Sequence, residues 1–265
     1  MNELVLIVGA AVFGAVIGSF LNVVILRSFT GRSLAGRSSC ATCSTPLSWY
    51  ELVPIASFCV QRGRCRTCGA RISWQYVSVE LITATLFALT ASQLSLLPTT
   101  ASVVVALYYA VVMSLIVVIG VYDVKHKIIP NRFVYSLIIL SALFVVMDFS
   151  WGRLLAGPVL AAPLALMWLV SHGRWIGLGD AKLVWAFGWF LGLVGGLSAV
   201  IFGFWIGAVF GIALIVVQRM VQKSSASLKT EIPFGPFLLL GFLLVLFTGM
   251  SATDVITSMM HVLQI

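Results

Sequence analysis

"GRWIGLGDAKLVWAF", residues 173–187, places a carboxylate, Asp180, inside a stretch that is otherwise apolar enough to enter a membrane. An ionised carboxylate near hydrocarbon costs roughly 2.5–3.5 kcal/mol, so an aspartate in this setting is a candidate functional residue. The structural alternative is that Asp180 caps a helix that follows a glycine turn. These 15 residues do not decide between the two interpretations.

The composition of the whole chain is that of a polytopic membrane protein. Of the 265 residues, 61% are hydrophobic and only 9% are charged, whereas about 25% of the residues in ordinary soluble domains are charged. The N-terminal apolar run has no basic residue before it and no cleavage site of small residues, so we expect a retained helix and not a cleavable signal peptide. We therefore predict an all-α polytopic membrane protein.

The apolar runs predict how often the chain crosses the membrane, because about 20 residues span the hydrocarbon core. We expect about eight transmembrane helices, near residues 4–26, 77–97, 102–122, 133–149, 154–171, 181–194, 196–218 and 234–250. The sixth run is short and rich in glycine, which is tolerated where a segment faces protein or a water-filled cavity. The remaining stretch, 251–265, is expected to be an interfacial tail.

The 16 Lys and Arg residues predict the orientation of these helices, because basic residues are enriched in cytoplasmic loops. With eight helices and the N-terminus outside, every Lys and Arg except Arg153 falls on one side, which is therefore cytoplasmic. Asp123 ends the third helix and Asp180 starts the sixth, so both lie at one depth on that side. Glu3 and Glu80 lie near predicted helix ends and are interpreted as ordinary boundary charges.

The loop between the first two apolar runs carries two C-x2-C pairs. Cys40, Cys43, Cys65 and Cys68 have the form of a closed structural zinc site with four thiolate ligands. The cytoplasm keeps thiols reduced, which argues against disulfides. We predict one structural Zn²⁺ on these four residues, with a redox or vestigial pair as the alternative, and we interpret Cys59 as a small buried residue.

These features divide the chain into a first transmembrane helix at 1–27, a small cytoplasmic zinc-binding loop domain at 28–75 and a multi-helix membrane domain at 76–265. The arginines of the loop are accounted for by the bias of basic residues towards the cytoplasm. Membrane lipids are therefore the expected partners of these arginines, and no nucleic acid is expected.

Two carboxylates held close together share a proton, so that one acts as base on a water while the other polarises a scissile carbonyl. Asp123 and Asp180 are therefore candidates for an aspartyl protease dyad. Gly177 and Gly179 can adopt backbone conformations closed to other residues and let an extended substrate approach. A proton-coupled transporter is the alternative, since intramembrane aspartates also form proton relays. A membrane-anchored zinc-ribbon adaptor would leave both aspartates unexplained.

With these residues in place, the chain resembles the type IV prepilin peptidases, membrane aspartyl proteases with a GxGD motif. The resemblance is carried by "GSFLNVVILR", the paired C-x2-C with "RGRCRTCGARIS", "YDVKHKIIPN", "GLGDAKL" and "PFGPFLLLG". It implies that Asp123 and Asp180 are the catalytic dyad of a hydrolase of the bacterial cytoplasmic (inner) membrane. The implied substrates are the basic leaders of type IV prepilins and of type II secretion or competence pseudopilins, cleaved at the cytoplasmic membrane face.

The resemblance also implies that the new N-terminus is methylated with S-adenosylmethionine, an activity associated with the cysteine-bearing loop. Lys182 matches a lysine that follows GxGD in the family, and we assign it to substrate or headgroup contact.

The stretch "EIPFGPF", residues 231–237, precedes the last apolar run. Pro233 and Pro236 keep this stretch from being regular helix. We expect it to lie beside the dyad and to present the leader as an extended strand, with Gly235 allowing close approach. The alternative is a plain proline turn at the start of a helix.

Overall fold

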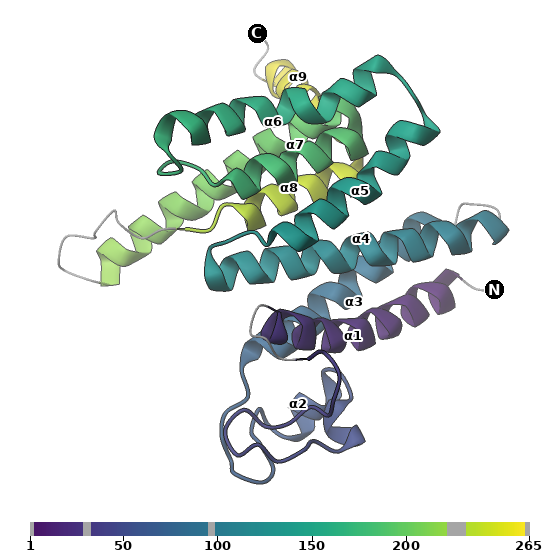
Figure 1. Ribbon diagram of the computed structural model, residues 1–265, viewed down its shortest axis with the longest axis vertical. Helices are drawn as coiled ribbons and strands as arrows, with labels where there is room; N and C mark the ends of the chain where they lie inside the picture. The colour runs from purple at the N-terminus through teal and green to yellow at the C-terminus, as the bar shows by residue number, and fades with distance from the viewer. Residues whose placement is uncertain (1–2, 29–32, 95–98, 222–231, 263–265) are drawn as a thin grey trace. The chain divides into compact units, whose positions relative to one another are not determined.

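The computed structural model describes residues 3–28, 33–94, 99–221 and 232–262, and these residues are almost entirely helical (Figure 1). This confirms the predicted all-α class. The chain forms two compact units, Met1–Val121 and Tyr122–Ile265, so the division falls inside helix α4. The predicted three-part division at residues 27 and 75 stays a prediction.

The first unit is built on a close pair of helices, α1 (Glu3–Arg27) and α3 (Trp74–Leu94). Between them lie a short 3-10 helix, η1 (Trp49–Leu52), and α2 (Ala56–Val60), and α4 (Thr99–His126) follows. Gly14 and Gly18 form a G-x3-G pattern on α1, and a Cβ added at Gly18 would lie 2.8 Å from the Glu80 Cα. Small residues allow two helix backbones to approach closely in a membrane, which explains how α1 and α3 pack.

The second unit has α7 (Leu178–Val221) at its centre. Helices α5 (Asn131–Met147), α6 (Trp151–Ser171) and α8 (Gly235–Thr248) pack against α7, and the short α9 (Ala252–Val262) also contacts it (Figure 1). The aromatic rings of Phe187 on α7 and Phe242 on α8 stack with centroids 4.6 Å apart. A buried hydrogen bond of 2.9 Å, from the Ala252 amide to the Ser198 hydroxyl, holds the start of α9.

Helix α7 combines two of the predicted membrane runs, 181–194 and 196–218, into one element of 44 residues. A straight helix of this length would measure roughly 65 Å, about twice the thickness of the hydrocarbon core. The element is interrupted at Gly192, whose φ of 74° and ψ of −177° are not helical. Because this conformation is open mainly to glycine, Gly192 breaks the helix close to where the sequence predicts a boundary.

Five helices are long and apolar enough to cross a membrane: α1, α3, α6, the Val103–His126 part of α4 and the Leu178–Gln218 part of α7. Helices α5 and α8 are apolar but shorter. Each predicted run therefore falls on an apolar helix, although the end of the run at 77–97 lies outside the described residues. The number of about eight spans is not confirmed.

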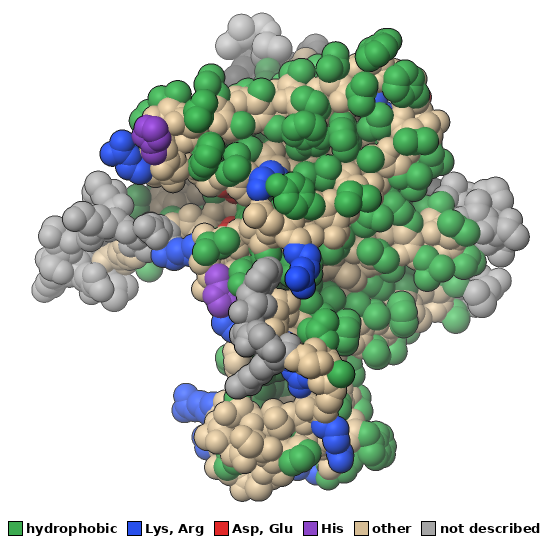
Figure 2. All heavy atoms as spheres, viewed as in Figure 1, with side chains coloured by type: hydrophobic (Ala, Val, Ile, Leu, Met, Phe, Trp, Pro, Cys, Tyr) green, Lys and Arg blue, Asp and Glu red, His purple; other side chains and the backbone are tan. Residues whose placement is uncertain are grey.

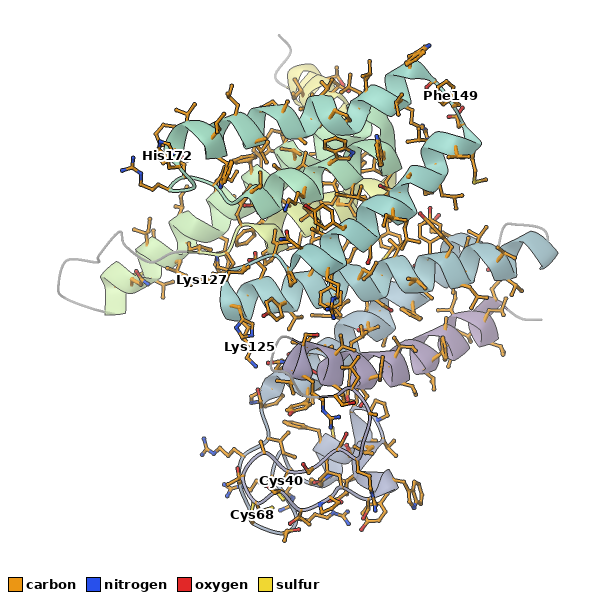
Figure 3. All side chains as sticks on the ribbon, viewed as in Figure 1. Cys40, Cys68, Lys125, Lys127, Phe149 and His172 are labelled. Carbon is orange, nitrogen blue, oxygen red and sulfur yellow. The ribbon has the colours of Figure 1, made fainter. Side chains whose placement is uncertain are left out.

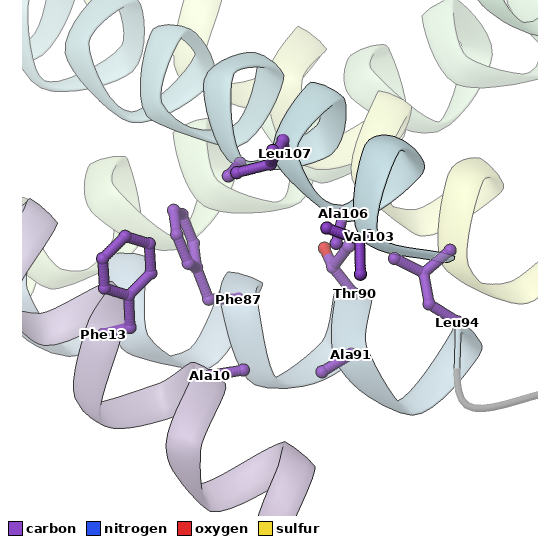
Figure 4. Close-up of a pocket in the computed structure, with 10 residues that line it drawn as sticks. Ala10, Phe13, Phe87, Thr90, Ala91, Leu94, Val103, Ala106 and Leu107 are labelled. Atoms are coloured by element: carbon purple, nitrogen blue, oxygen red, sulfur yellow. The ribbon is translucent and has the colours of Figure 1, made fainter. Parts of the chain in front are cut away.

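An apolar pocket of about 270 Å³ lies in the first unit among α1, α3 and α4 (Figure 4). Phe13, Phe87 and Leu107 contribute to its walls. Thr90 also lines it, but its hydroxyl donates to the Leu86 carbonyl at 2.8 Å. The pocket therefore offers apolar walls and not a set of reactive groups.

The contact between α6 and α7 yields a stability prediction. A Cβ at Gly188 would lie 2.6 Å from the backbone oxygen of Ala156, whereas a Cβ at Gly211 would meet nothing within 4 Å. We expect Gly188→Ala to cost about 1–3 kcal/mol, because two backbones must move apart. Gly211→Ala should be neutral or stabilise by about 0.5–1 kcal/mol. Thermal unfolding of both variants in one detergent tests this, and equal melting temperatures would contradict it.

Candidate active site

Asp180 lies in the first turn of α7, directly after the glycine turn. One of its carboxylate oxygens, Oδ2, accepts a hydrogen bond of 3.2 Å from the backbone amide of Gly177. The Asp180 amide in turn donates to the Gly177 carbonyl, also at 3.2 Å. Only 8% of Asp180 is exposed. The carboxylate thus binds the amide of the residue just before its own helix, as the acidic residue of a capping box does. It is also buried at a helix start, where an acidic group is stabilised.

Asp123 lies in the last turn of α4 and is 4% exposed. Its Oδ2 accepts a hydrogen bond of 3.1 Å from the backbone amide of Gly235, which is 112 residues away in the sequence. Helix α8 begins at Gly235, so this amide is one of those that have no partner within the helix. The start of α8 is therefore fixed to the end of α4 through the carboxylate.

The two aspartates line one cavity of about 690 Å³ in the second unit. Four other residues singled out in the sequence line it as well: Gly177, Gly179, Lys182 and Pro233. Gly235 joins this group through its bond to Asp123. Figure 2 shows side-chain atoms of Asp or Glu inside a hollow on the face that it displays. The structure thus brings all seven predicted protease-site residues together, while their catalytic and binding roles stay predictions.

Lys182 is held on one side of this cavity by residues of α5. Its Nζ donates to the Asn131 side-chain oxygen at 2.7 Å and lies 4.8 Å from the centre of the Tyr135 ring. Asn131 also lines the cavity. The ammonium group is therefore oriented by an amide oxygen and an aromatic face, which is a favourable place for a cation.

The four predicted zinc ligands are also together, in the loop of the first unit. The sulfur atoms of Cys40, Cys43, Cys65 and Cys68 all lie within 4.8 Å of one another. Cys40 and Cys68 are side by side in Figure 3, with their sulfurs 3.9 Å apart. Four sulfurs around a tetrahedral zinc at about 2.3 Å are separated by about 3.8 Å, so the donor set fits this metal. Zinc bound there would supply cross-linking of the loop and not reaction chemistry.

The two C-x2-C turns are built in the same way. The amides of Cys40 and Cys65 donate to the carbonyls of Thr45 and Ala70, five residues further on, at 3.0 and 2.9 Å. The residue after each pair, Ser44 or Gly69, has a positive φ. The stretches "SCATCSTPL" and "RCRTCGARI" share the form C-x-T-C, so this repeat is visible in the sequence and could have been predicted.

The surroundings of Cys43 favour the thiolate form of its side chain. Its sulfur forms a hydrogen bond of 3.2 Å with the Thr45 hydroxyl. This bond and a second one to the Thr45 backbone lower the pKa of the Cys43 thiol to about 6. Because metals bind the thiolate, such a lowered pKa favours ligation at neutral pH. Cys59 is exposed, so its interpretation as a small buried residue is wrong. It lies on the short helix α2, which has no buried residue.

Glu80 also differs from its sequence-based expectation. It was expected to be an ordinary boundary charge, but it is only 7% exposed and lies inside α3. Its Oε2 accepts a hydrogen bond of 2.7 Å from the amide of Ile55, at the start of α2. Glu80 therefore anchors the cysteine-bearing loop to the helix pair. The sequence signal was its place four residues inside an apolar run, where a charge needs a partner.

These observations define a helical multi-pass membrane protein with a four-cysteine loop and a cavity that holds two buried carboxylates. Comparison with known proteins then gives the family. Residues 12–94 match the model of the bacterial peptidase A24 N-terminal domain, and residues 110–212 match that of the type IV leader peptidase family. The chain is similar to the prepilin leader peptidase/N-methyltransferase of Bacillus subtilis (strain 168), with 33% identity over 243 residues that cover 90% of this chain and 92% of the relative.

Two further relatives have the same description. The protein of Myxococcus xanthus (strain DK1622) is 36% identical over 188 residues, which cover 68% of this chain and 54% of the relative. That of Stutzerimonas stutzeri is 28% identical over 268 residues and covers 89% of each chain. No solved structure matches. The chain belongs to the type IV leader peptidase family and is a membrane peptidase. The transporter alternative has no support in these matches.

The cysteine cluster yields a test of metal binding. We expect the purified protein to contain about one zinc per chain, because four thiolates complete a closed shell. Cys40→Ser should lose the metal, while Cys59→Ser should retain it, since Cys59 is outside the cluster. Elemental analysis of the three proteins measures this. A zinc content near zero in the fully reduced parent protein would contradict the assignment.

Proposed function

We propose that this protein cleaves the leader peptides of type IV prepilins and related pseudopilins, with Asp123 and Asp180 as an aspartyl dyad. One observation carries the proposal: both carboxylates are buried, line one cavity, and have Oδ2 bonded to a backbone amide. The names of the relatives supply the substrate class, because these proteins are described as prepilin leader peptidases. Pseudopilins of type II secretion or competence follow from the sequence resemblance.

In the proposed reaction, the ionised aspartate takes a proton from a water molecule, whose oxygen then attacks the carbonyl carbon of the scissile peptide bond. The protonated aspartate donates its proton to the carbonyl oxygen, and the other aspartate passes the proton that it took from water to the leaving nitrogen. The C–N bond then breaks and a hydroxyl proton of the tetrahedral intermediate returns to the aspartate that protonated the carbonyl oxygen, which releases the leader as a carboxylic acid and the pilin as a new amine. Because Oδ2 of each aspartate accepts a hydrogen bond from a backbone amide, Oδ1 of each remains for the water and the substrate. Because the donors are fixed by the fold, they need no rearrangement during the reaction.

The segment before α8 supports presentation of the leader as an extended strand. Ile232 and Pro233 lie outside the helix and line the cavity, together with Phe234. Glu231, the first residue of the predicted "EIPFGPF" element, lies outside the described residues. A peptide bond inside a helix has its carbonyl engaged, so cleavage requires local unwinding. Non-helical backbone is tolerated at membrane depth where it lines a cavity of this kind.

The distribution of basic residues supports a cytoplasmic location for the dyad. Lys125 and Lys127 lie at the end of α4 that carries Asp123 (Figure 3), and Lys182 lies two residues from Asp180. Lysines concentrate on the cytoplasmic side of membrane proteins. We therefore place the active site at the cytoplasmic face of the bacterial inner membrane, with the N-terminus of the chain outside.

We also propose that the chain methylates the N-terminus that cleavage creates, using S-adenosylmethionine. This rests on the names of the relatives, which combine peptidase and N-methyltransferase. The sequence has no glycine-rich methyltransferase signature. We therefore assign no residue to the methyl donor and derive no step through it.

The dyad has a direct test. Asp123→Asn and Asp180→Asn should each abolish leader cleavage, because neither amide can act as the base or donate as the acid. Asp148→Asn is the matched control: Asp148 is exposed and lies 3.5 Å from Arg153 in an ion pair, and it should retain activity. The measurement is processing of a purified prepilin by each purified variant in detergent. Substantial cleavage by either dyad variant would remove the assignment.

The methylation proposal has a separate test. With S-adenosylmethionine present, the processed pilin should gain the mass of one methyl group at its N-terminal amine, and without the donor it should be cleaved but unmodified. Cys40→Ser should lower methylation more than cleavage, since no atom of the aspartyl mechanism comes from the cysteine loop. Mass spectrometry of the processed pilin distinguishes the two products. An unmodified N-terminus at saturating donor would contradict this activity.

A further inference from the structure

We propose that Ile129 is a positioning residue that sets the separation of the starts of α7 and α8, whose backbone amides hold the carboxylates of Asp180 and Asp123. Ile129 lies in the loop between α4 and α5, is 9% exposed and lines the cavity. An isoleucine in an apolar sequence gives no local signal of such a role. The proposal rests on the dyad assigned above, but its own basis is the packing of this one side chain between two glycines.

The first contact is with the glycine turn of Asp180. A Cβ added to Gly179 would lie 2.7 Å from the Ile129 Cβ, closer than real Cβ atoms come to another atom. It would also lie 3.3 Å from Cδ1. Ile129 therefore packs directly on the bare backbone of the residue before Asp180, and no other amino acid fits at Gly179 unless Ile129 moves.

The second contact is with the start of α8. A Cβ at Gly235 would lie 3.2 Å from the Ile129 Cδ1 and 2.6 Å from the Asp123 Oδ2. The same side chain thus touches both helix starts: its Cβ lies on Gly179, and its Cδ1 lies on Gly235. Both contacts lie close to the hydrogen bonds that hold the two carboxylates. The Gly235 amide itself donates to Asp123, and the amide of Gly177, two residues before Gly179, donates to Asp180.

Ile129 is well suited to act as a spacer because its own conformation is restricted. It precedes Pro130, which confines its backbone to extended conformations. Its side chain branches at Cβ, which restricts rotation about χ1. The loop is fixed at its beginning by the bond from the Lys127 amide to the Asp123 carbonyl, at 2.7 Å. A short, stiff segment therefore connects Asp123 to the Ile129 side chain, which lies against the starts of both α7 and α8.

The consequence is a specific kinetic effect. Removing the Ile129 side chain allows the starts of α7 and α8 to shift relative to each other. Misplacement of a catalytic group by about 1 Å costs up to about 100-fold in rate. We therefore expect Ile129→Ala to lower kcat about 10–100-fold with a much smaller change in KM. Leu137→Ala is the matched control, because Leu137 is a fully buried aliphatic residue of α5 outside the cavity lining. It should lower the melting temperature comparably and leave kcat of the folded protein near that of the parent.

The decisive experiment is a pair of double-mutant cycles on leader cleavage. The first combines Gly179→Ala with Ile129→Gly, which removes the Cβ that the new methyl group would meet. The second combines Gly177→Ala with Ile129→Gly, because a Cβ at Gly177 would meet Asp180 and not Ile129. Substitutions of residues in direct contact have non-additive effects, and a Cβ at Gly177 would make no contact with Ile129. We expect the first double variant to be at least as active as Gly179→Ala alone, and the losses in the second cycle to multiply.

Each outcome bears on one proposal only. If the activity losses multiply in both cycles, the positioning role of Ile129 is wrong. It is also wrong if Ile129→Ala changes only KM, or if its kcat falls no more than that of Leu137→Ala at equal thermal stability. The dyad stands or falls separately, on whether Asp123→Asn and Asp180→Asn cleave the leader. Inactive dyad variants together with uncoupled cycles would leave the aspartyl mechanism intact and remove only the role of Ile129.

Discussion

A buried carboxylate among apolar helices needs hydrogen-bond donors, and a helical membrane protein has few to spare. Nearly every backbone amide inside a helix is already bonded to a carbonyl of the same helix. The amides that remain are those of the first turn and of the residues just before it. Asp123 and Asp180 take their donors from these places, namely Gly235 at the start of α8 and Gly177 before α7. The site is therefore confined to a point where two helices begin and one ends.

That confinement explains why glycine, more than any charged residue, shapes the cavity. The amide of Gly235 reaches the Asp123 Oδ2 at 3.1 Å, and a Cβ on the same residue would be only 2.6 Å from that oxygen. Any side chain at this position would displace the carboxylate that its own amide binds. Gly18 in the first unit serves a different purpose, since it allows two helix backbones to touch. Close approach to a carboxylate and close approach of helices thus make the same demand on sequence.

The residues that the sequence could identify are those whose chemistry conflicts with their surroundings. Asp123 and Asp180 are charges beside apolar runs, and the four cysteines have metal-ligand spacing, so each was visible without a structure. Ile129 was not, because an isoleucine in an apolar chain carries no such conflict. The bond between Lys182 and Asn131 joins residues 51 apart, and no local pattern encodes it. Glu80 was visible, but hydropathy does not say whether a charge faces lipid or a neighbouring loop. The interruption of α7 at Gly192 lies close to the boundary predicted between the runs at 181–194 and 196–218, because a glycine-rich stretch can leave helical geometry.

The two compact units also separate the chemistry. Every group placed in the cleavage reaction belongs to Tyr122–Ile265, and the cysteine cluster belongs to Met1–Val121. One family model matches residues 12–94, inside the first unit, and the other matches residues 110–212, which begin shortly before the division and cover much of the second unit. Under the proposed function, the two reactions must follow in a fixed order, because methylation acts on the amine that hydrolysis releases. Because no group of the proposed cleavage reaction comes from the four-cysteine loop, that loop is available for a step other than hydrolysis.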